Sequence, residues 1–236
     1  AITKPGDIVT IEKQDQPGIE ISMSGIKYEP IPVDPENNTA GKAILSLLDT
    51  LESKQGFKVH IEKGIPPGSG IGSSSASAAA AVVGVNELLN KPLKNSELLV
   101  HGMAGEAVAS GGFHADNIAP ALFGGIILIR SYEPLDILNL PVPKSLFSTA
   151  VLPDFIVNTL DARRLLPKRV PLKSAVEQAG NLAGFTLGLH ESDFDLLGRS
   201  MVDLFAEPFR AELIPGYPSV RQSAMDAGAI GCGISG

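Results

Sequence analysis

A glycine- and serine-rich segment at residues 66–77, Pro-Pro-Gly-Ser-Gly-Ile-Gly-Ser-Ser-Ser-Ala-Ser, leads directly into an alanine-rich stretch. Because Gly68, Gly70 and Gly72 alternate, the backbone can take positive φ angles and another molecule can approach it closely. The alanine-rich stretch predicts a buried helix over residues 76–89. The first N–H groups of a helix have no intrahelical partner and lie at the positive end of its dipole. The segment therefore predicts a site that binds a phosphate group.

The composition excludes several classes of function. The chain has 236 residues and a formal net charge of −7, whereas a nucleic-acid groove needs clustered Lys and Arg. A single cysteine, Cys232, excludes an intramolecular disulfide and a multi-cysteine zinc site, and fits a cytoplasmic protein. No apolar run reaches the roughly 20 residues of a membrane-spanning helix, and no signal peptide is recognisable. We therefore expect no nucleic-acid and no membrane partner.

The order of predicted elements is typical of a mixed α+β architecture with two lobes. Alternating apolar and polar residues predict strands, and apolar residues at helical spacing predict helices. The predicted strands lie at 7–13, 18–24, 57–63, 124–131 and 149–152. The predicted helices include one from Asn38 to a C-cap at Gly56, and others over 96–110, 172–190, 194–206 and 219–227. The Pro- and Leu-rich span 133–145 predicts a crossing between the lobes, which gives domains 1–143 and 144–236.

Three kinds of phosphate loop compete for residues 66–77. A P-loop requires a lysine after its last glycine, and none follows Gly72. A dinucleotide-binding loop has the spacing Gly-x-Gly-x-x-Gly and an acidic residue about 20 positions later, and neither feature fits here. The third pattern, Pro-x-Gly-x-Gly-x-Gly-Ser-Ser before an alanine-rich helix, resembles the second motif of the GHMP kinase superfamily. A short Gly-Ser run is often only a flexible turn, but the length of this match favours phosphate binding.

Four further segments resemble homoserine kinases, in the same order along the chain. They are His114-Ala115-Asp116-Asn117-Ile118-Ala119-Pro120, Ala162-Arg163-Arg164-Leu165-Leu166-Pro167, Glu207-Pro208-Phe209-Arg210 with Leu213-Ile214-Pro215-Gly216, and Gly233-Ile234-Ser235-Gly236. The resemblance implies the two-lobed GHMP kinase fold, with an N-terminal lobe like ribosomal S5 domain 2 and a ferredoxin-like C-terminal lobe. Homoserine kinases normally have a further strand and loop before the position of Ala1, and their last glycine motif continues after Gly236. We therefore expect the sequence to be a piece of a longer chain.

The resemblance also implies an activity. A homoserine kinase transfers the γ-phosphate of ATP to the side-chain hydroxyl of L-homoserine, and gives O-phospho-L-homoserine for threonine biosynthesis. It implies a cytoplasmic enzyme with ATP and L-homoserine as its partners, and it allows a homodimer.

The predicted nucleotide site is the glycine loop with the start of its helix. It comprises Pro66, Pro67, Gly68, Ser69, Gly70, Ile71, Gly72, Ser73, Ser74 and Ser75. By resemblance, Ser74 and Glu106 bind Mg²⁺, which prefers hard oxygen ligands and keeps several waters. A glutamate on a helix is by default a solvated charge, so this role for Glu106 comes from the resemblance alone. Asn38 and the segment 63–67 are candidates for contact with the nucleotide base.

The predicted acceptor site needs groups for an ammonium, a carboxylate and a hydroxyl. Arg163 and Arg210 have the planar guanidinium that grips a carboxylate, although a lone arginine is more often a surface charge. The resemblance places His114, Asp116 and Asn117 beside homoserine. Asp116 would bind the ammonium, accept the hydroxyl proton, or do both, and its structural alternative is a helix N-cap. Asn117 would orient the hydroxyl and His114 would support the pocket, so the catalytic set is Asp116, Asn117 and Arg163.

Phosphoryl transfer depends on in-line positioning and charge neutralisation, so we expect direct attack by the hydroxyl without a phosphoenzyme. Two other hypotheses remain. Another small-molecule kinase of the superfamily would have no need of both arginine-containing segments. A non-catalytic nucleotide-binding relative would have no need to keep Glu106 and Asp116 together with those arginines.

Overall fold

The computed structural model describes residues 4–26, 30–153, 162 and 164–235. The chain falls into two compact units, Ala1–Asn139 and Leu140–Gly236. Helices and strands are mixed, which confirms the α+β class. The boundary expected at residue 143 and the topology expected for each lobe stay predictions.

The first unit is built on a three-stranded sheet that contains β1 (Ile8–Gln14), β2 (Ile19–Gly25) and β3 (Gly56–Lys63). Their order is β1-β3-β2, so the central strand is the last of the three in the sequence. β3 runs antiparallel to β1 and parallel to β2. A parallel pair needs a crossover connection, which here contains α1 (Thr39–Thr50).

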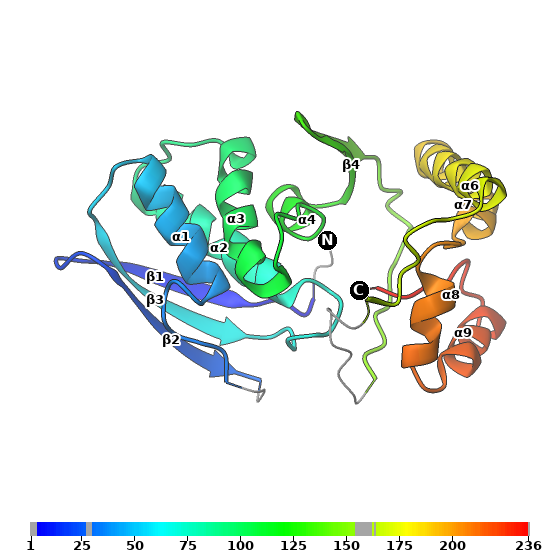
Figure 1. The fold of residues 1–236 in the computed structure, drawn as a ribbon, viewed down its shortest axis with the longest axis horizontal. Coiled ribbons are helices and arrows are strands. Elements are labelled where there is room, and N and C mark those ends of the chain that lie inside the picture. The colour runs from blue at the N-terminus through cyan, green and yellow to red at the C-terminus, as the bar shows by residue number, and fades with distance from the viewer. Residues whose placement is uncertain (1–3, 27–29, 154–161, 163, 236) are drawn as a thin grey trace. The chain divides into compact units, whose positions relative to one another are not determined.

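The core lies between this sheet and three helices, α1, α2 (Ser73–Leu88) and α3 (Asn95–Ser110), which cover one face of the sheet (Figure 1). Along β3 the side chains alternate between buried and exposed, as the sequence predicts. The small residues of α2 let it lie close to the strands: a Cβ added at Gly84 would be 2.8 Å from Cδ1 of Ile11 in β1. This close packing fixes the start of α2, and with it the glycine loop, at one edge of the core.

The end of α1 differs from the prediction of a C-cap at Gly56. The helix ends at Thr50 with Leu51 as its C-cap. Glu52 takes the left-handed conformation with φ 50°, and the Ser53 N–H donates to the Leu48 carbonyl over 2.9 Å. Gly56 instead begins β3, where a side chain would overlap the carbonyl oxygen of Gln16. This glycine therefore permits a close approach of backbones and does not end a helix.

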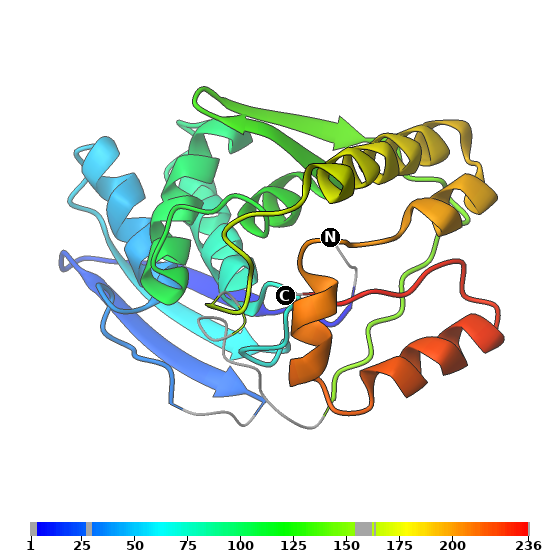
Figure 2. The ribbon, with the colours of Figure 1, turned by 45° about the vertical axis from the view of Figure 1, so that its right-hand side comes forward.

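The first unit also contains a short helix, α4 (Ile118–Phe123), and a hairpin of β4 (Ile126–Tyr132) and β5 (Leu135–Leu140). Figure 2 shows the hairpin in green. The expectation that residues 133–145 only connect two lobes is wrong for 135–140, which pair with β4. An ion pair between Arg130 and Asp136 links the two strands.

The second unit is helical over most of its described residues. Its elements are α6 (Leu172–Glu191), α7 (Phe194–Ser200), α8 (Glu207–Arg210), a 3₁₀ turn (Ala211–Leu213) and α9 (Tyr217–Asp226). Residues 149–152 were expected to form a strand, but they lie in irregular structure. α7 is shorter than the predicted helix 194–206, because it ends at Ser200 with Met201 as its C-cap. Beyond it, the Asp203 carboxylate accepts N–H bonds from Phe205, Ala206 and Glu207 at the start of α8.

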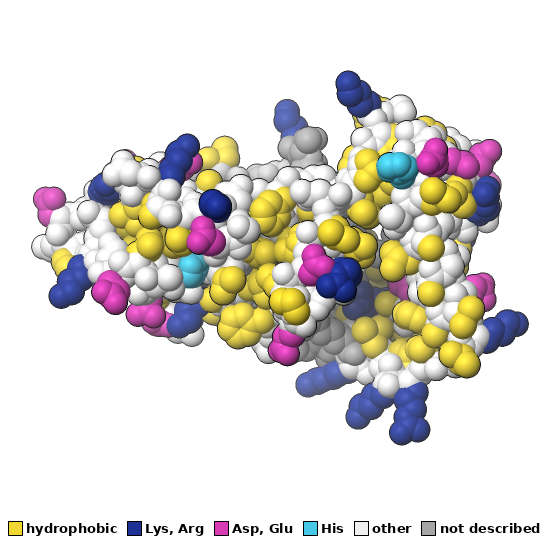
Figure 3. All heavy atoms as spheres, turned by 90° about the horizontal axis from the view of Figure 1, so that it is seen from above, with side chains coloured by type: hydrophobic (Ala, Val, Ile, Leu, Met, Phe, Trp, Pro, Cys, Tyr) yellow, Lys and Arg dark blue, Asp and Glu magenta, His cyan; other side chains and the backbone are white. Residues whose placement is uncertain are grey.

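Two properties of the surface bear on possible partners. On the face in Figure 3, the Lys and Arg side chains of the first unit are interspersed with Asp and Glu side chains. Within the described residues, no helix combines the length and the apolar composition that a membrane crossing requires.

A buried histidine in the first unit predicts a dependence of stability on pH. His101 is 6% exposed, and Nδ1 of its ring lies 2.9 Å from Oγ of Ser46. Burial lowers the pKa of His101 from its ordinary value of 6.5. The unfolded chain therefore binds a proton that the folded chain does not, and stability present above pH 6.5 is lost as the pH falls below it.

We expect the free energy of unfolding to fall by at most about 1.4 kcal/mol per pH unit below about pH 6.5. Urea unfolding of the wild type and His101→Gln at about pH 5.5 and pH 7.5 measures this effect. The free energy of unfolding of the variant should depend less on pH, whereas His190→Gln, at an exposed position of α6, should behave as the wild type does. Equal pH dependence in all three proteins would contradict the assignment.

Candidate functional site

The glycine loop has the backbone conformation that its sequence predicts. Gly68, Gly70 and Gly72 have φ angles of 73°, 71° and 78°, in the left-handed region that favours glycine. α2 begins at Ser73, which is earlier than the predicted residue 76. Three consecutive serines therefore occupy the first turn of the helix, where N–H groups have no intrahelical acceptor.

The loop leaves polar groups available for an anion. Gly72 is the N-cap of α2, and no side chain caps the helix there. Within the described chain, the Ser69 hydroxyl is buried and has no hydrogen-bond partner. A buried hydroxyl without a partner costs free energy, and a phosphate oxygen would supply an acceptor for it. The loop therefore fits the phosphate groups of ATP on structural grounds as well as by motif.

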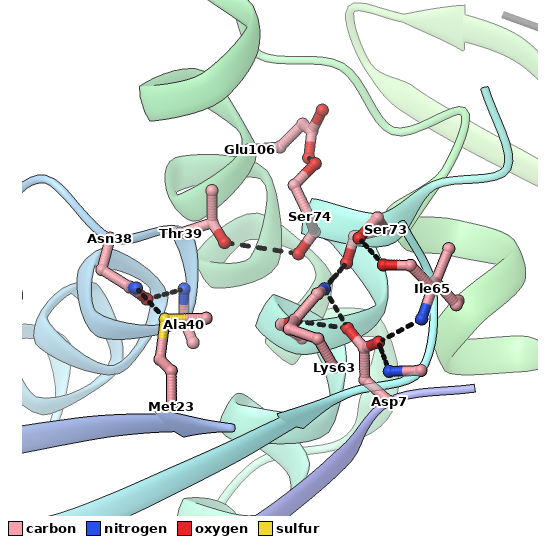
Figure 4. Close-up of polar contacts among 12 residues, drawn as sticks. Asp7, Met23, Asn38, Thr39, Ala40, Lys63, Ile65, Ser73, Ser74 and Glu106 are labelled. Carbon is pink, nitrogen blue, oxygen red and sulfur yellow. Dashed lines mark hydrogen bonds and ion pairs between the residues drawn. The ribbon is translucent and has the colours of Figure 1, made fainter. Parts of the chain in front are cut away.

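Glu106 meets the start of α2 from the neighbouring helix α3. Its carboxylate is buried, with the residue 7% exposed, and Oε2 accepts hydrogen bonds from Ser74 Oγ over 2.9 Å and Ser75 Oγ over 2.7 Å. The structure thus brings together Ser74 and Glu106, the two residues predicted to bind Mg²⁺, and gives Glu106 a buried position instead of a solvated one (Figure 4).

The donor chemistry of this pair fits Mg²⁺, because both residues offer oxygen atoms. The described residues contain no cluster of three or more His, Cys, Asp or Glu side chains that could hold a metal. A magnesium ion here would therefore complete its shell with waters and phosphate oxygens, as Mg²⁺ commonly does beside nucleotides.

The predicted acceptor residues of the first unit lie next to the glycine loop. A Cβ added at Gly72 would be 3.1 Å from Oδ1 of Asn117, so the Asn117 side chain lies against the loop. Asn117, not Asp116, is the N-cap of α4, and its side chain makes no capping bond. Asp116 is exposed, and the half-buried ring of His114 lies beside Gly112. The alternative role of Asp116 as the N-cap is therefore wrong, and the Asn117 side chain is not used to cap the helix.

The predicted arginines belong to the second unit. Arg163 lies outside the described residues. Arg210 is the last residue of α8 and is half-buried. The helix begins with Glu207 and Pro208, which suits its first turn because a proline there loses no helical hydrogen bond.

Asn38 and Lys63, candidates for contact with the base, have their polar groups engaged within the protein. The Asn38 side chain accepts from the N–H groups of Ala40 and Gly41 as the N-cap of α1, and its amide donates to the Pro32 carbonyl. The Lys63 ammonium donates to Asp7, to Ser77 Oγ and to the Ser73 carbonyl. Both side chains therefore support local structure at the edge of the site.

Two polar residues at the site, Asp7 and Ser77, were not predicted as site residues. Asp7 precedes β1, and its carboxylate is 1% exposed and paired with Lys63. Ser77 lies in α2 and donates to Asp7 over 2.6 Å. Asp7 lies in a segment that was interpreted only for its alternation, and Ser77 is the last residue of the segment 66–77, to which no individual role was given. The available signal was an acidic residue before β1 and a lysine at the end of β3, which antiparallel pairing brings together.

Comparison with known proteins places the chain among kinases. Residues 38–125 match the model of the GHMP kinases N terminal domain. The chain is 45% identical to a homoserine kinase of Chlorobium phaeobacteroides over 100% of its length and 77% of that protein. It is 46% identical to a homoserine kinase of Methanococcus vannielii, again over its whole length and 78% of that protein.

Solved structures give the same result. The crystal structure of homoserine kinase from Cytophaga hutchinsonii superposes with a TM-score of 0.92 at 44% identity, over 99% of this chain and 74% of that one. A mevalonate kinase from L. major superposes with a TM-score of 0.68 at 18% identity, over 98% and 74%, which shows a shared fold.

Proposed function

The chain belongs to the homoserine kinase family of GHMP kinases, and we infer from this that it is an ATP-dependent homoserine kinase. It transfers the γ-phosphate of ATP to the side-chain hydroxyl of L-homoserine and forms O-phospho-L-homoserine, as a step of threonine biosynthesis. The observation that carries this conclusion is the 45–46% identity to the homoserine kinases of Chlorobium phaeobacteroides and Methanococcus vannielii over the whole chain, together with the superposition at a TM-score of 0.92.

We propose that residues 66–75 hold the phosphate groups of ATP. The left-handed glycines, the uncapped start of α2 and the Ser69 hydroxyl support this role. Ser74 and Glu106 would hold Mg²⁺, which would neutralise phosphate charge when bound. Glu106 also holds the Ser74 hydroxyl in place over 2.9 Å, so the two proposed ligands are already side by side.

The acceptor side of the site is also a proposal. Asn117 lies against Gly72, which supports a position beside the reacting phosphate and a role in orienting the homoserine hydroxyl. Asp116, one residue away and exposed, is available to bind the ammonium or to accept the hydroxyl proton. Arg163 and Arg210 would grip the carboxylate, and His114 would support the pocket wall.

The proposed chemistry is a direct transfer. The homoserine oxygen forms a bond to the γ-phosphorus as the bond from that phosphorus to the bridging oxygen of ADP breaks, and the hydroxyl proton leaves to Asp116 or to solvent. We further propose that the enzyme works in the cytoplasm, for which the single cysteine is the support. The homodimer stays a prediction.

A panel of acceptors tests the function. The protein is incubated with ATP, Mg²⁺ and either L-homoserine, mevalonate, galactose or no acceptor, and ADP release is followed with identification of the phosphorylated product. We expect transfer to L-homoserine alone. Turnover of mevalonate or galactose without turnover of homoserine would contradict the assignment, and nucleotide binding without any transfer would favour a non-catalytic relative.

A further inference from the structure

A buried ion pair lies directly beneath the phosphate loop. Lys63, the last residue of β3, and Asp7, just before β1, have side chains that are 2% and 1% exposed. The two residues are far apart in sequence and meet because β1 and β3 pair antiparallel. At this edge the backbones are in contact: a Cβ added at Gly64 would overlap the carbonyl oxygen of Gly6.

The pair joins the two ends of the loop. Asp7 Oδ1 accepts hydrogen bonds from the N–H groups of Gly64 and Ile65, both over 3.0 Å, where the chain enters the loop. On the other side, the Lys63 ammonium donates over 3.0 Å to the Ser73 carbonyl and over 3.0 Å to Ser77 Oγ, where the chain leaves the loop in α2. The Ser77 hydroxyl in turn donates to Asp7 Oδ2 over 2.6 Å. Figure 4 shows Asp7 and Lys63 with their partners Ile65 and Ser73, and Glu106 beside Ser74 above them.

Stability alone gives little reason for charges at this place. Burial of a charge carries a desolvation cost, and burial lowers the pKa of Lys63 although the hydrogen bond and attraction of Asp7 raise it. Apolar or neutral replacements of buried ion pairs are often as stable as the original. The same two side chains, however, fix both ends of the loop, beside the bond that Ser73 Oγ donates to the Ile65 carbonyl over 2.8 Å and the bond from the Ser69 N–H to the Pro66 carbonyl over 3.3 Å.

We propose that Asp7 and Lys63 are positioning residues for phosphoryl transfer: they clamp the two ends of the loop so that the first turn of α2 faces the ATP phosphates. The proposal rests on the proposed kinase function for its catalytic consequence. Neither side chain has to touch the nucleotide, because the ammonium already uses its donors on Asp7, Ser73 and Ser77.

The double variant Asp7→Asn with Lys63→Met separates this role from stability. It removes both charges of the buried pair together, and the asparagine keeps an acceptor for the two N–H groups, so we expect the fold to persist. The bonds from residue 63 to Ser73 and Ser77 are lost. We expect kcat/KM for ATP to fall by about tenfold or more, since small misplacements of positioning groups are costly, with KM for homoserine unchanged. Amide hydrogen exchange should become faster in residues 64–77 and stay unchanged in α3.

The matched control makes the equivalent replacements, carboxylate to amide and lysine to methionine, at an exposed ion pair of the same sheet. It is Glu20→Gln with Lys58→Met, whose side chains are 67% and 59% exposed. This control should match the wild type in kcat/KM for ATP, in KM for homoserine and in amide hydrogen exchange. Binding of a non-hydrolysable ATP analogue, measured by calorimetry without acceptor, completes the test. Wild-type binding and wild-type exchange in the Asp7–Lys63 double variant would overturn the clamp. A wild-type protein that fails to phosphorylate homoserine would overturn the proposed function, whereas the exchange and binding measurements would still decide on the clamp.

Discussion

Replacement of Glu106 by glutamine is expected to lower kcat for homoserine phosphorylation by at least about a hundredfold, on the scale of losing one preorganised electrostatic contact to a developing charge. The amide oxygen of glutamine can still accept bonds from Ser74 and Ser75, so the buried contact persists. What the variant loses is the negative charge that would hold Mg²⁺. Burial of the neutral glutamine costs less desolvation free energy than burial of the carboxylate does, so thermal stability should not fall.

Steady-state kinetics over a range of Mg²⁺ concentrations measure this effect. The Mg²⁺ concentration for half-maximal rate should rise in Glu106→Gln. The control is Glu87→Gln, which removes a carboxylate that is 52% exposed in α2 and should leave both values unchanged. A Glu106→Gln enzyme with the wild-type rate and the wild-type Mg²⁺ dependence would show that this carboxylate is structural.

The second large effect is expected at Arg210. Loss of a charge-assisted, two-pronged contact to the homoserine carboxylate should raise KM for homoserine by about 10- to 100-fold in Arg210→Ala, with KM for ATP unchanged. Arg210→Lys keeps the positive charge but not the planar guanidinium, so its KM for homoserine should lie between those of the wild type and Arg210→Ala. Arg199→Ala, at an exposed position of α7, is the control and should behave as the wild type does.

An acceptor without a carboxylate makes this test specific. The compound 3-aminopropan-1-ol has the ammonium and the hydroxyl of homoserine and lacks its carboxylate. The wild type should use it poorly, and Arg210→Ala should use it no worse than the wild type does. If the variant loses the same factor with both acceptors, Arg210 acts on something other than the carboxylate.

Local signals predicted a large part of the fold. Alternation located β1, β2 and β3, and the three glycines gave the loop its conformation, because both signals are carried by neighbouring residues. β5 was not predicted, because its leucines lie in a proline-rich span and it forms a strand by pairing with β4. Residues 201–206 were predicted as helix, but the Asp203 side chain binds the N–H groups that lead into α8, and periodicity carries no signal for such a contact.

In the candidate site, too, contacts carried by sequence motifs were predicted, whereas contacts that depend on strand pairing were not. Ser74 and Glu106 were paired by motif, and the packing of α2 on α3 brings them together. Asp7 and Lys63 were not paired, because their contact depends on strand register and on the close approach of Gly6 to Gly64. Interactions between residues distant in sequence carry no periodic signal, and here such an interaction supports the loop.

The order of strands in the sheet has a consequence for synthesis on the ribosome. β1 and β2 leave the ribosome before β3, but they are not neighbours in the described sheet, since β3 lies between them. Until residue 63 has left the exit tunnel, neither strand has the partner that it pairs with in this sheet, and the edges that β3 will cover are open to other chains. The phosphate loop is the next segment to emerge, directly after β3. Completion of the described sheet and assembly of the loop are therefore adjacent events in the synthesis of the chain.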